Sequence, residues 1–311
     1  MTPVLVVVGS LNMDFVVTVD RLPASGETVL GGDFQMLPGG KGANQACAAG
    51  RLAQTTAVRM VGRVGHDVFA DHLKASLAAA GVDVSAVAGT RSQPTGIAQI
   101  WVDRNGQNSI VVASGANFAF PAADIEGARG SFAGARFALF QLETPLQTVA
   151  AALKIARESG ARTILDPAPA QVLPRAMLEA VDILTPNEGE ACILQGQAPS
   201  RLSKDDAPKL ARAVLELGPA AVILKLGDQG CFYFDGREEI FSPAFQVEPR
   251  DTTAAGDTFN AALAVALSEG FDIQAALRFA NAAAAISVTR LGAQASAPSR
   301  REVDEFLRTI Q

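Results

Sequence analysis

The segment DTTAAGDTFNAAL, residues 251–263, carries residue types that phosphoryl transfer needs, at a spacing that could bring them together. Only small residues precede Asp257, so the backbone N–H groups of this turn are open to a ligand. They belong to Ala254, Ala255 and Gly256. The helix expected to follow adds a partial positive charge at the same point. Such a pocket could hold phosphoryl oxygens while Asp257 accepts the proton of an alcohol. The structural alternative is that Asp257 caps the helix and Gly256 makes a tight turn.

A second polar segment, LPGGKGANQACAAGRLA at residues 37–53, joins a glycine-rich turn to an alanine-rich helical pattern. The run Gly-Gly-Lys-Gly suggests a phosphate cradle, but the chain lacks the G-x-x-x-x-G-K-[ST] pattern of a P-loop. Asn12 and Asp14 follow the first apolar run, and their side-chain oxygens suit the vicinal hydroxyls of a sugar. As isolated residues, both types are common in turns. Glu143 ends the apolar run FALFQLE and could equally be a solvated strand end.

The apolar runs predict which elements position these residues. PVLVVVG at residues 3–9 is typical of a central strand buried on both faces. Beyond residue 130, the strand-like runs ARFALFQLE, ARTILDPAP, VDILTPNE and AAVILKLG alternate with helical patterns. This order predicts an α/β fold with a doubly wound, mainly parallel sheet flanked by helices. Ligands bind at the carboxyl ends of such strands. The residues expected there are Glu143, Asp166, Asn187 and the loop at 225–230.

The last third is helical, with patterns in GDTFNAALAVALSEG, IQAALRFANAAAAISVTRLG and SRREVDEFLRTI, while FQVEP at 245–249 predicts a strand. Two early segments, FVVTVDRLP and TGIAQIWVDRNGQNSIVVASG, alternate apolar and polar residues. Asn105-Gly106 within the second favours a tight hairpin turn. These segments predict a small antiparallel sheet, formed as a lid by insertions at about 11–40 and 92–114. We expect one α/β domain over residues 1–311.

Composition argues against several classes of protein. The net charge of −6 and pI of 5.1 oppose general binding to nucleic acid or to an acidic membrane. Cys47, Cys192 and Cys231 lack CxxC spacing, which opposes a disulfide scaffold or structural zinc site and fits a cytoplasmic protein. No stretch approaches the roughly 18 apolar residues of a membrane span. The first residues read as a strand rather than a signal peptide.

The chain resembles the ribokinase-like family of carbohydrate kinases over essentially its whole length. DTTAAGD resembles the carboxy-terminal signature of that family, and GGKGANQACAAGRLA resembles its amino-terminal signature. GSLNMDF, DPAPA, TPNEGE, KLGDQG and GAQASAPSR resemble further family segments in the same order. The resemblance implies a doubly wound fold with a β lid, and transfer of phosphate from ATP to the 5-hydroxyl of D-ribose. It also implies dependence on Mg²⁺ and K⁺ and a homodimer formed through the lid.

The resemblance further implies a role for individual residues. Asp257 would be the general base, beside an anion hole of Ala254, Ala255 and Gly256. The sugar would contact Asn12, Asp14, Gly39, Gly40, Lys41, Gly42, Asn44, Glu143 and Asp257. The ATP site would include Asn187, Glu190, Lys225, Gly227, Gly230, Gly256 and Asn281. Potassium would be held, mostly through backbone carbonyls, by Asp251, Thr253, Ser287, Arg290, Gly292 and Ser296.

Several of these positions also have structural interpretations. Asn187 and Glu190 could form the capping box of a helix, and Asn281 could be a simple polar position on a helix face. Lys225 stands where family members often carry Thr, and it could meet an ATP phosphate or point to solvent. The substrate could instead be deoxyribose, fructose, a sugar acid or a nucleoside. A catalytically silent sugar-binding regulator is the alternative from another class of protein.

Overall fold

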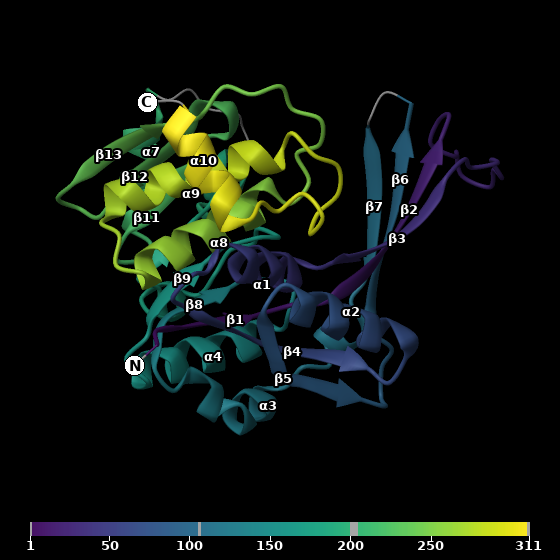
Figure 1. Cartoon of the computed structure of the whole chain (residues 1–311), viewed down its shortest axis with the longest axis horizontal. Helices are drawn as coiled ribbons and strands as arrows, with labels where there is room; N and C mark the ends of the chain where they lie inside the picture. The colour runs from purple at the N-terminus through teal and green to yellow at the C-terminus, as the bar shows by residue number, and fades with distance from the viewer. Residues whose placement is uncertain (1, 105–106, 200–204, 310–311) are drawn as a thin grey trace.

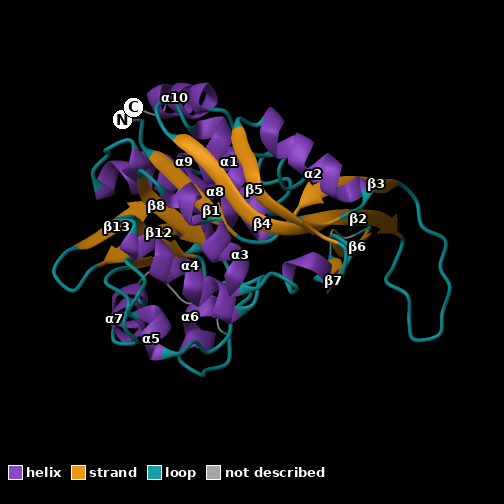
Figure 2. Ribbon diagram, turned by 90° about the horizontal axis from the view of Figure 1, so that it is seen from below, coloured by secondary structure: helices purple, strands orange, loops and turns teal. Residues whose placement is uncertain are grey.

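A nine-stranded sheet runs through the middle of the molecule, with helices on both of its faces (Figures 1 and 2). The computed structural model describes residues 2–104, 107–199 and 205–309. In spatial order the strands are β13 (Glu239–Pro243), β12 (Gly230–Phe234), β11 (Val222–Lys225), β10 (Ile183–Leu184), β9 (Arg162–Leu165), β8 (Ala135–Phe140), β1 (Val4–Val8), β4 (Ala57–Gly65) and β5 (Val82–Thr90). Neighbours from β5 to β11 are parallel, whereas β12 pairs antiparallel with both β11 and β13. The predicted doubly wound, mainly parallel sheet is confirmed.

The central strand β1 explains why both faces are covered. Successive side chains of a strand point to opposite faces, so Leu5 and Val7 enter one core while Val4, Val6 and Val8 enter the other. The helices that contribute to the first core are α1 (Lys41–Leu52), α2 (Val68–Ala79), α8 (Ala255–Ser268), α9 (Ile273–Ser287) and α10 (Arg300–Thr309). Those of the second are α3 (Ala122–Gly127), α4 (Leu146–Glu158), α5 (Arg175–Leu178), α6 (Glu188–Leu194) and α7 (Ala207–Leu215).

A separate four-stranded sheet, which we call the lid, projects to one side of the main sheet (Figure 1). Its order is β3 (Phe34–Gly39), β2 (Asn12–Val19), β6 (Gly96–Asp103) and β7 (Asn108–Ala113). The outer pairs are antiparallel, as the sequence predicts, but the inner pair β2–β6 is parallel. The reason is that β2 and β6 follow β1 and β5, which are themselves parallel to β4. The predicted Asn105-Gly106 turn lies outside the described residues.

The structure differs from the prediction at one expected strand and at the end of one expected helix. FQVEP is not a strand: β13 ends at Pro243, and the chain continues as a loop. Its apolar residues serve packing instead, since Phe245 meets the ring of Phe306 edge-on at 5.3 Å between centroids. Pro249 lacks the N–H that a sheet ladder would need. The helical pattern expected to reach residue 292 ends at Ser287.

Candidate functional site

The first turn of α8 holds Asp257, which is only 5% exposed. Ala254 precedes the helix at φ 59°, the one positive φ of a non-glycine residue in the described part of the chain. That left-handed conformation costs an L-residue roughly 1–2 kcal/mol. The N–H of Ala255 donates to the carbonyl of Thr252 (3.2 Å), while Ala254 and Gly256 line a cavity beside Asp257. The helix-capping alternative for Asp257 is wrong, because the helix already begins at Ala255.

Two amide side chains from α1 hold the carboxylate of Asp257. Asn44 donates from Nδ2 to Oδ2 (3.0 Å), and Gln45 donates from Nε2 to Oδ1 (2.9 Å). Oδ1 of Asn44 is buried and has no partner among the described residues, so it can accept a bond from a ligand. The structure therefore brings Asn44, expected at the sugar, directly to Asp257.

The turn before α1 packs against the end of β1. A Cβ on Gly42 would lie 2.6 Å from backbone atoms of Gly9 and Ser10, so only glycine fits. Ser10 Oγ donates to Glu143 Oε2 (2.6 Å), and the N–H of Lys41 donates to the same oxygen (3.0 Å). Glu143 thus occupies the N-terminus of α1, where the helix dipole favours a carboxylate. Gly42 itself acts here as a packing residue.

Asp14 lies at the start of the lid, close to Gly39 on the neighbouring strand. A Cβ on Gly39 would overlap the carboxylate of Asp14, and one on Gly40 (φ 87°) would lie 2.7 Å from the backbone nitrogen of Asn12. Burial, with a smaller effect of the negative charge on Glu143, raises the pKa of Asp14 to about 7. The residues expected at the sugar thus meet where the lid joins the main sheet.

Asn117, just beyond the lid, fixes the orientation of Asn12. Its Oδ1 accepts from the N–H of Leu11 (2.9 Å), and its Nδ2 donates to the carbonyl of Leu11 (3.0 Å). These backbone bonds identify which end of the Asn117 side chain is the amide nitrogen Nδ2. The Asn12 atom that lies 2.7 Å from Nδ2 must therefore be the acceptor Oδ1. The oxygen that the sequence suggested for a sugar hydroxyl is therefore already bonded. The amide nitrogen of Asn12 and the second lone pair of that oxygen are left for a ligand.

Charges gather around Asp257. Burial raises its pKa to about 6; the positive charge of Lys41 opposes this rise, and the negative charge of Asp166 adds to it. At Lys41 burial disfavours the charged form, but the surrounding carboxylates outweigh burial and raise its pKa. A pKa of about 6 keeps Asp257 mainly ionised at neutral pH, the form in which it can accept a proton.

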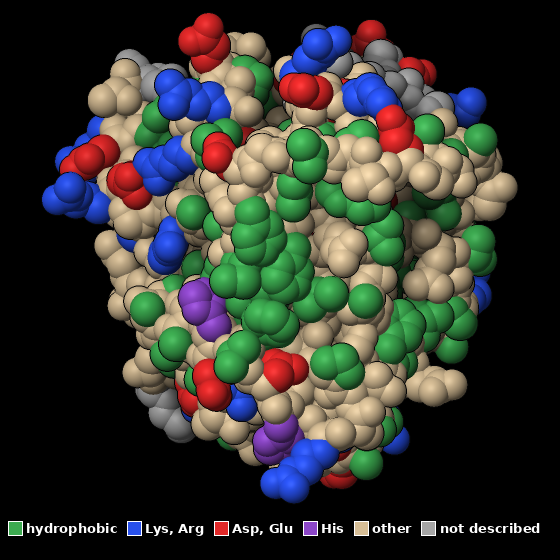
Figure 3. Space-filling view, turned by 90° about the vertical axis from the view of Figure 1, so that its right-hand side faces the viewer, with side chains coloured by type: hydrophobic (Ala, Val, Ile, Leu, Met, Phe, Trp, Pro, Cys, Tyr) green, Lys and Arg blue, Asp and Glu red, His purple; other side chains and the backbone are tan. Residues whose placement is uncertain are grey.

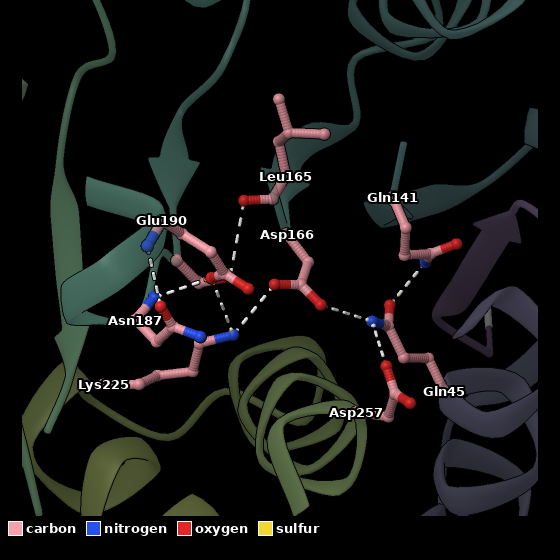
Figure 4. A network of polar contacts seen from close by, with 9 residues as sticks. Gln45, Gln141, Leu165, Asp166, Asn187, Glu190, Lys225 and Asp257 are labelled. Carbon is pink, nitrogen blue, oxygen red and sulfur yellow. Dashed lines mark hydrogen bonds and ion pairs between the residues drawn. The ribbon is translucent and has the colours of Figure 1, made fainter. Parts of the chain in front are cut away.

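A cavity of about 670 Å³ opens on the other side of Asp257, and its wall includes Asn187 and Glu190. Asn187 Oδ1 accepts from the N–H of Glu190 (2.8 Å), and Glu190 Oε2 accepts from the N–H of Asn187 (2.7 Å). This reciprocal pair is the capping box that begins α6, so the structural interpretation of both residues is confirmed. Figure 4 shows both side chains beside Lys225, which lines the same cavity.

Lys225 lies in the same cavity wall and is 14% exposed. Its Nζ is 2.8 Å from Asp166 Oδ1 and 4.0 Å from Glu190 Oε2. Burial disfavours its charge, but the two carboxylates outweigh burial and raise its pKa. The alternative that Lys225 points to solvent is therefore wrong.

A smaller cavity of about 280 Å³ adjoins the first, since Gly227, Thr252 and Ala255 line both. Its wall is mostly apolar and includes Asn281, whose amine group donates to Ser242 Oγ and to the Ser242 carbonyl (both 3.0 Å). We call this cavity the apolar slot, and its mostly apolar lining suits a flat ring. Gly230, at φ 108°, packs instead against the β13 backbone and shapes the β12–β13 pair.

The segment before α8 is joined to the chain after α9 through Asp251. Its Oδ2 accepts from the N–H of Gly292 (2.8 Å), and its Oδ1 accepts from the N–H of Thr253 (2.9 Å). Burial opposes ionisation, but these bonds outweigh it and lower the pKa of Asp251. Ser287 and Ser296 donate their hydroxyls to carbonyls three residues earlier, and the guanidinium of Arg290 bonds to Glu302 (2.6 Å).

Sequence reasoning missed several residues that complete the site. They are Ser10, Gln45, Asn117 and Gln141, all buried polar side chains. The one sequence signal was Gln45, a polar residue directly after Asn44 in an otherwise alanine-rich helix. Within the described residues, no group of three His, Cys, Asp or Glu side chains is placed to hold a metal ion. In that same part of the chain, no helix is both long and apolar enough to cross a membrane.

Comparison with known proteins gives the family. Residues 3–300 match the model of the pfkB family of carbohydrate kinases. A ribokinase from Bacillus subtilis is 45% identical over 302 residues, covering 97% of this chain and 98% of its own. Among solved structures, a Thermotoga maritima ribokinase superposes with a TM-score of 0.89 at 39% identity, covering 99% of this chain and all of its own. An Arabidopsis thaliana ribokinase complexed with ribose and ATP superposes with a TM-score of 0.90 at 36% identity over 99% of both chains. The chain therefore belongs to the pfkB family of carbohydrate kinases.

Proposed function

We propose that this protein is an ATP-dependent ribokinase, which transfers the terminal phosphoryl group of ATP to the 5-hydroxyl of D-ribose. The observation that carries the proposal is the position of Asp257. It lies between a cavity large enough for a nucleotide and Asn44 of α1, the helix that follows the lid strand β3. The Bacillus subtilis and Arabidopsis thaliana relatives, named as ribokinases, support ribose as the acceptor.

Asp257 is the proposed general base. Its carboxylate accepts the proton of the 5-hydroxyl while the N–H groups of Ala254 and Gly256 hold the moving phosphoryl oxygens, with Ala255 completing the turn. In a loose transition state the proton leaves late, so alignment of the base matters more than its basicity. Lys41 supplies positive charge beside the same carboxylate.

The sugar is proposed to lie between the lid root and α1. Asp14 accepts from ribose hydroxyls, the amide nitrogen of Asn12 donates to them, and Asn44 offers its free oxygen. Glu143 holds the Lys41 turn in place. The glycines at 39, 40 and 42 let this turn pack closely against Asp14, Asn12 and the chain that follows β1.

ATP is proposed to fill the two joined cavities, with phosphates near Gly256, Lys225 and Gly227, and adenine in the apolar slot beside Asn281. Gly230 packs against the β13 backbone, and Ser242 of that strand accepts from Asn281. Magnesium would travel with the ATP phosphates and neutralise their charge during transfer. Glu190 fits this role, because its Oε1 lies outside the capping box and can accept from water around the ion, while Asn187 holds Glu190 in place through that box.

Potassium is proposed to bind where Asp251 meets the chain after α9. The donors there are hard oxygens, namely one carboxylate and carbonyls of the turn, which suit a weakly charged ion. The side chains of Ser287, Arg290 and Ser296 are bonded elsewhere, so their carbonyls, with those of Thr253 and Gly292, would be the ligands. A bound ion would stiffen the segment that leads into the strained Ala254 turn.

Purified protein with ATP, Mg²⁺ and K⁺ should phosphorylate D-ribose, measured by coupled ADP release and by mass spectrometry of the sugar phosphate. Removing Mg²⁺ should abolish turnover, and replacing K⁺ with the bulkier tetramethylammonium should slow it. Phosphorylation of deoxyribose, fructose or a nucleoside in preference to ribose would redirect the proposal to another kinase of this fold. No transfer to any acceptor would favour a silent sugar-binding protein.

We also propose that the protein is a homodimer joined through the lid. Strand register places Phe15, Met36 and Val111 on one lid face, opposite the face of Asn12 and Asp14. Met36 is 54% exposed and Val111 57% exposed. Figure 3, which looks onto the lid side of the molecule, shows apolar side chains gathered on that surface. A second copy could cover them.

Sedimentation velocity should show twice the monomer mass, and Met36→Lys combined with Val111→Lys should halve it. A monomeric wild-type protein at micromolar concentration would contradict the dimer.

The three cysteines are free and buried, which suits a reducing compartment. We therefore propose the cytoplasm, and cell fractionation would test this location.

A further inference from the structure

Gln45 links two carboxylates inside the site. It is fully buried on α1, and its Nε2 donates both to Asp257 Oδ1 (2.9 Å) and to Asp166 Oδ2 (3.0 Å). Its Oε1 accepts from Nε2 of Gln141. Ionised carboxylates only accept hydrogen bonds, so the amine end of Gln45 must face both of them. Figure 4 shows the resulting chain of contacts.

Lys225 lies at the opposite end of this chain. Its Nζ is 2.8 Å from Asp166 Oδ1, the oxygen that Gln45 does not use. The same ammonium group lies 3.5 Å from where a Cβ on Gly256 would be, so it also borders the proposed anion hole. The contacts therefore run without a gap from the nucleotide cavity through Asp166 and Gln45 to Asp257.

We propose that Gln45 and Lys225 are positioning residues for the general base. Gln45 aims the carboxylate of Asp257 and keeps it ionised, and Lys225 supports that ionisation from the nucleotide side by neutralising Asp166. This inference rests on the proposed role of Asp257 in sugar phosphorylation.

The charges facing Asp257 explain why such support is needed. α1 presents Lys41, which favours the carboxylate, together with the amide donors Asn44 and Gln45. The chain after β9 presents Asp166, which disfavours it. Lys225 offsets that effect, because its ammonium group lies beside the carboxylate of Asp166 and neutralises part of its charge. Glu143 and Glu190 act on the same cluster through Lys41 and Lys225.

Gln45→Met keeps the side-chain length but removes both donors. A hydrogen bond to a charged group is worth enough that kcat should fall by about 10- to 100-fold, with little change in KM for ribose or ATP. Losing a donor to the carboxylate favours its protonated form. The acid limb of kcat/KM for ribose reflects Asp14, with a pKa of about 7, as well as Asp257, with a pKa of about 6. The limb should therefore move to higher pH and become steeper as the pKa of Asp257 rises. An unmoved limb overturns the role of Gln45, even if the variant is less stable.

Lys225 is tested by a double-mutant cycle with Asp166, measured at saturating Mg-ATP. Lys225→Met leaves Asp166 unneutralised, so the acid limb should move to higher pH, and Lys225→Arg should restore it. Asp166→Asn should move the limb to lower pH and should cancel the effect of Lys225→Met in the double variant. An equal shift from Lys225→Met in both backgrounds, or a raised KM for ATP with no shift, overturns the role of Lys225.

The wild-type reaction separates this inference from the function beneath it. If the wild type phosphorylates ribose and Asp257→Asn lowers kcat by about 10²-fold or more while both pH profiles stay unmoved, only the positioning roles fail. If the wild type does not phosphorylate ribose, the proposed function itself fails.

Discussion

Asp257→Asn should lower kcat by about 10²- to 10⁴-fold, the usual worth of a general base. Both oxygens of Asp257 accept hydrogen bonds, from Asn44 and from Gln45. An asparagine offers one acceptor where the carboxylate has two, and it cannot take a proton from an alcohol. One of the two amide contacts would thus become donor against donor. Turnover at saturating ribose and Mg-ATP is the measurement.

The fold should survive this substitution, because neutralising a carboxylate that is 5% exposed also removes its desolvation cost. The circular dichroism spectrum should therefore match that of the wild type. Asp272→Asn is the matched control: Asp272 caps α9 by accepting from the N–H of Ala275 (2.7 Å), and Asn caps helices equally well. The control should keep wild-type turnover. A kcat for Asp257→Asn within threefold of the control would remove Asp257 from its role.

Gly42→Ala should cost the protein about 1–3 kcal/mol of unfolding free energy, as inserted methyl groups do in tight packing. The added Cβ would lie 2.6 Å from backbone atoms of Gly9 and Ser10, which cannot rotate away as a side chain could. Moving α1 outward would relieve the overlap. That movement would also pull Asn44 and Gln45 from Asp257, so kcat should fall together with stability. Urea denaturation and steady-state kinetics measure the two effects.

Gly127→Ala is the control for this change. Gly127 ends α3 on the surface, and no atom lies within 4 Å of an added Cβ. Alanine there should be neutral or slightly stabilising, since it favours helix more than glycine does. If Gly42→Ala retained both the unfolding free energy and the turnover of that control, the close approach of α1 to β1 would not be as tight as the geometry requires.

The sequence predicts the main sheet well, because the burial of each strand is visible in the residues of that strand alone. A continuous apolar run such as PVLVVVG is typical of a strand covered on both sides, and the side chains of β1 enter two cores. The prediction that FQVEP forms a strand was wrong, although it also rested on a local pattern of apolar residues. Its apolar residues alternate as in a strand, but Phe245 and Val247 serve a loop that lines a cavity. An alternating apolar pattern shows which side chains are buried, and a loop can bury side chains without pairing with a strand.

The site divides in a similar way. Gly256 and Asp257 were predictable, since a ligand-binding turn needs small residues and a carboxylate at fixed spacing. The orientation set by Asn117 was not predictable, because it depends on a backbone 106 residues away. The same holds for Lys225, whose partner Asp166 is 59 residues distant. Such contacts are properties of the assembled sheet, and single residue types do not reveal them.

The bonds that complete the site also join opposite ends of the chain. Asn44 and Asp257 are 213 residues apart, and Ser10 and Glu143 are 133 apart. Closing such long loops costs chain entropy, so contacts of this kind form late and slow the folding of the domains that depend on them. Asp257 meets its amide donors only after α1 and α8 have docked together. During refolding, recovery of activity should therefore mark the last step, whereas secondary structure can return while the enzyme is still inactive.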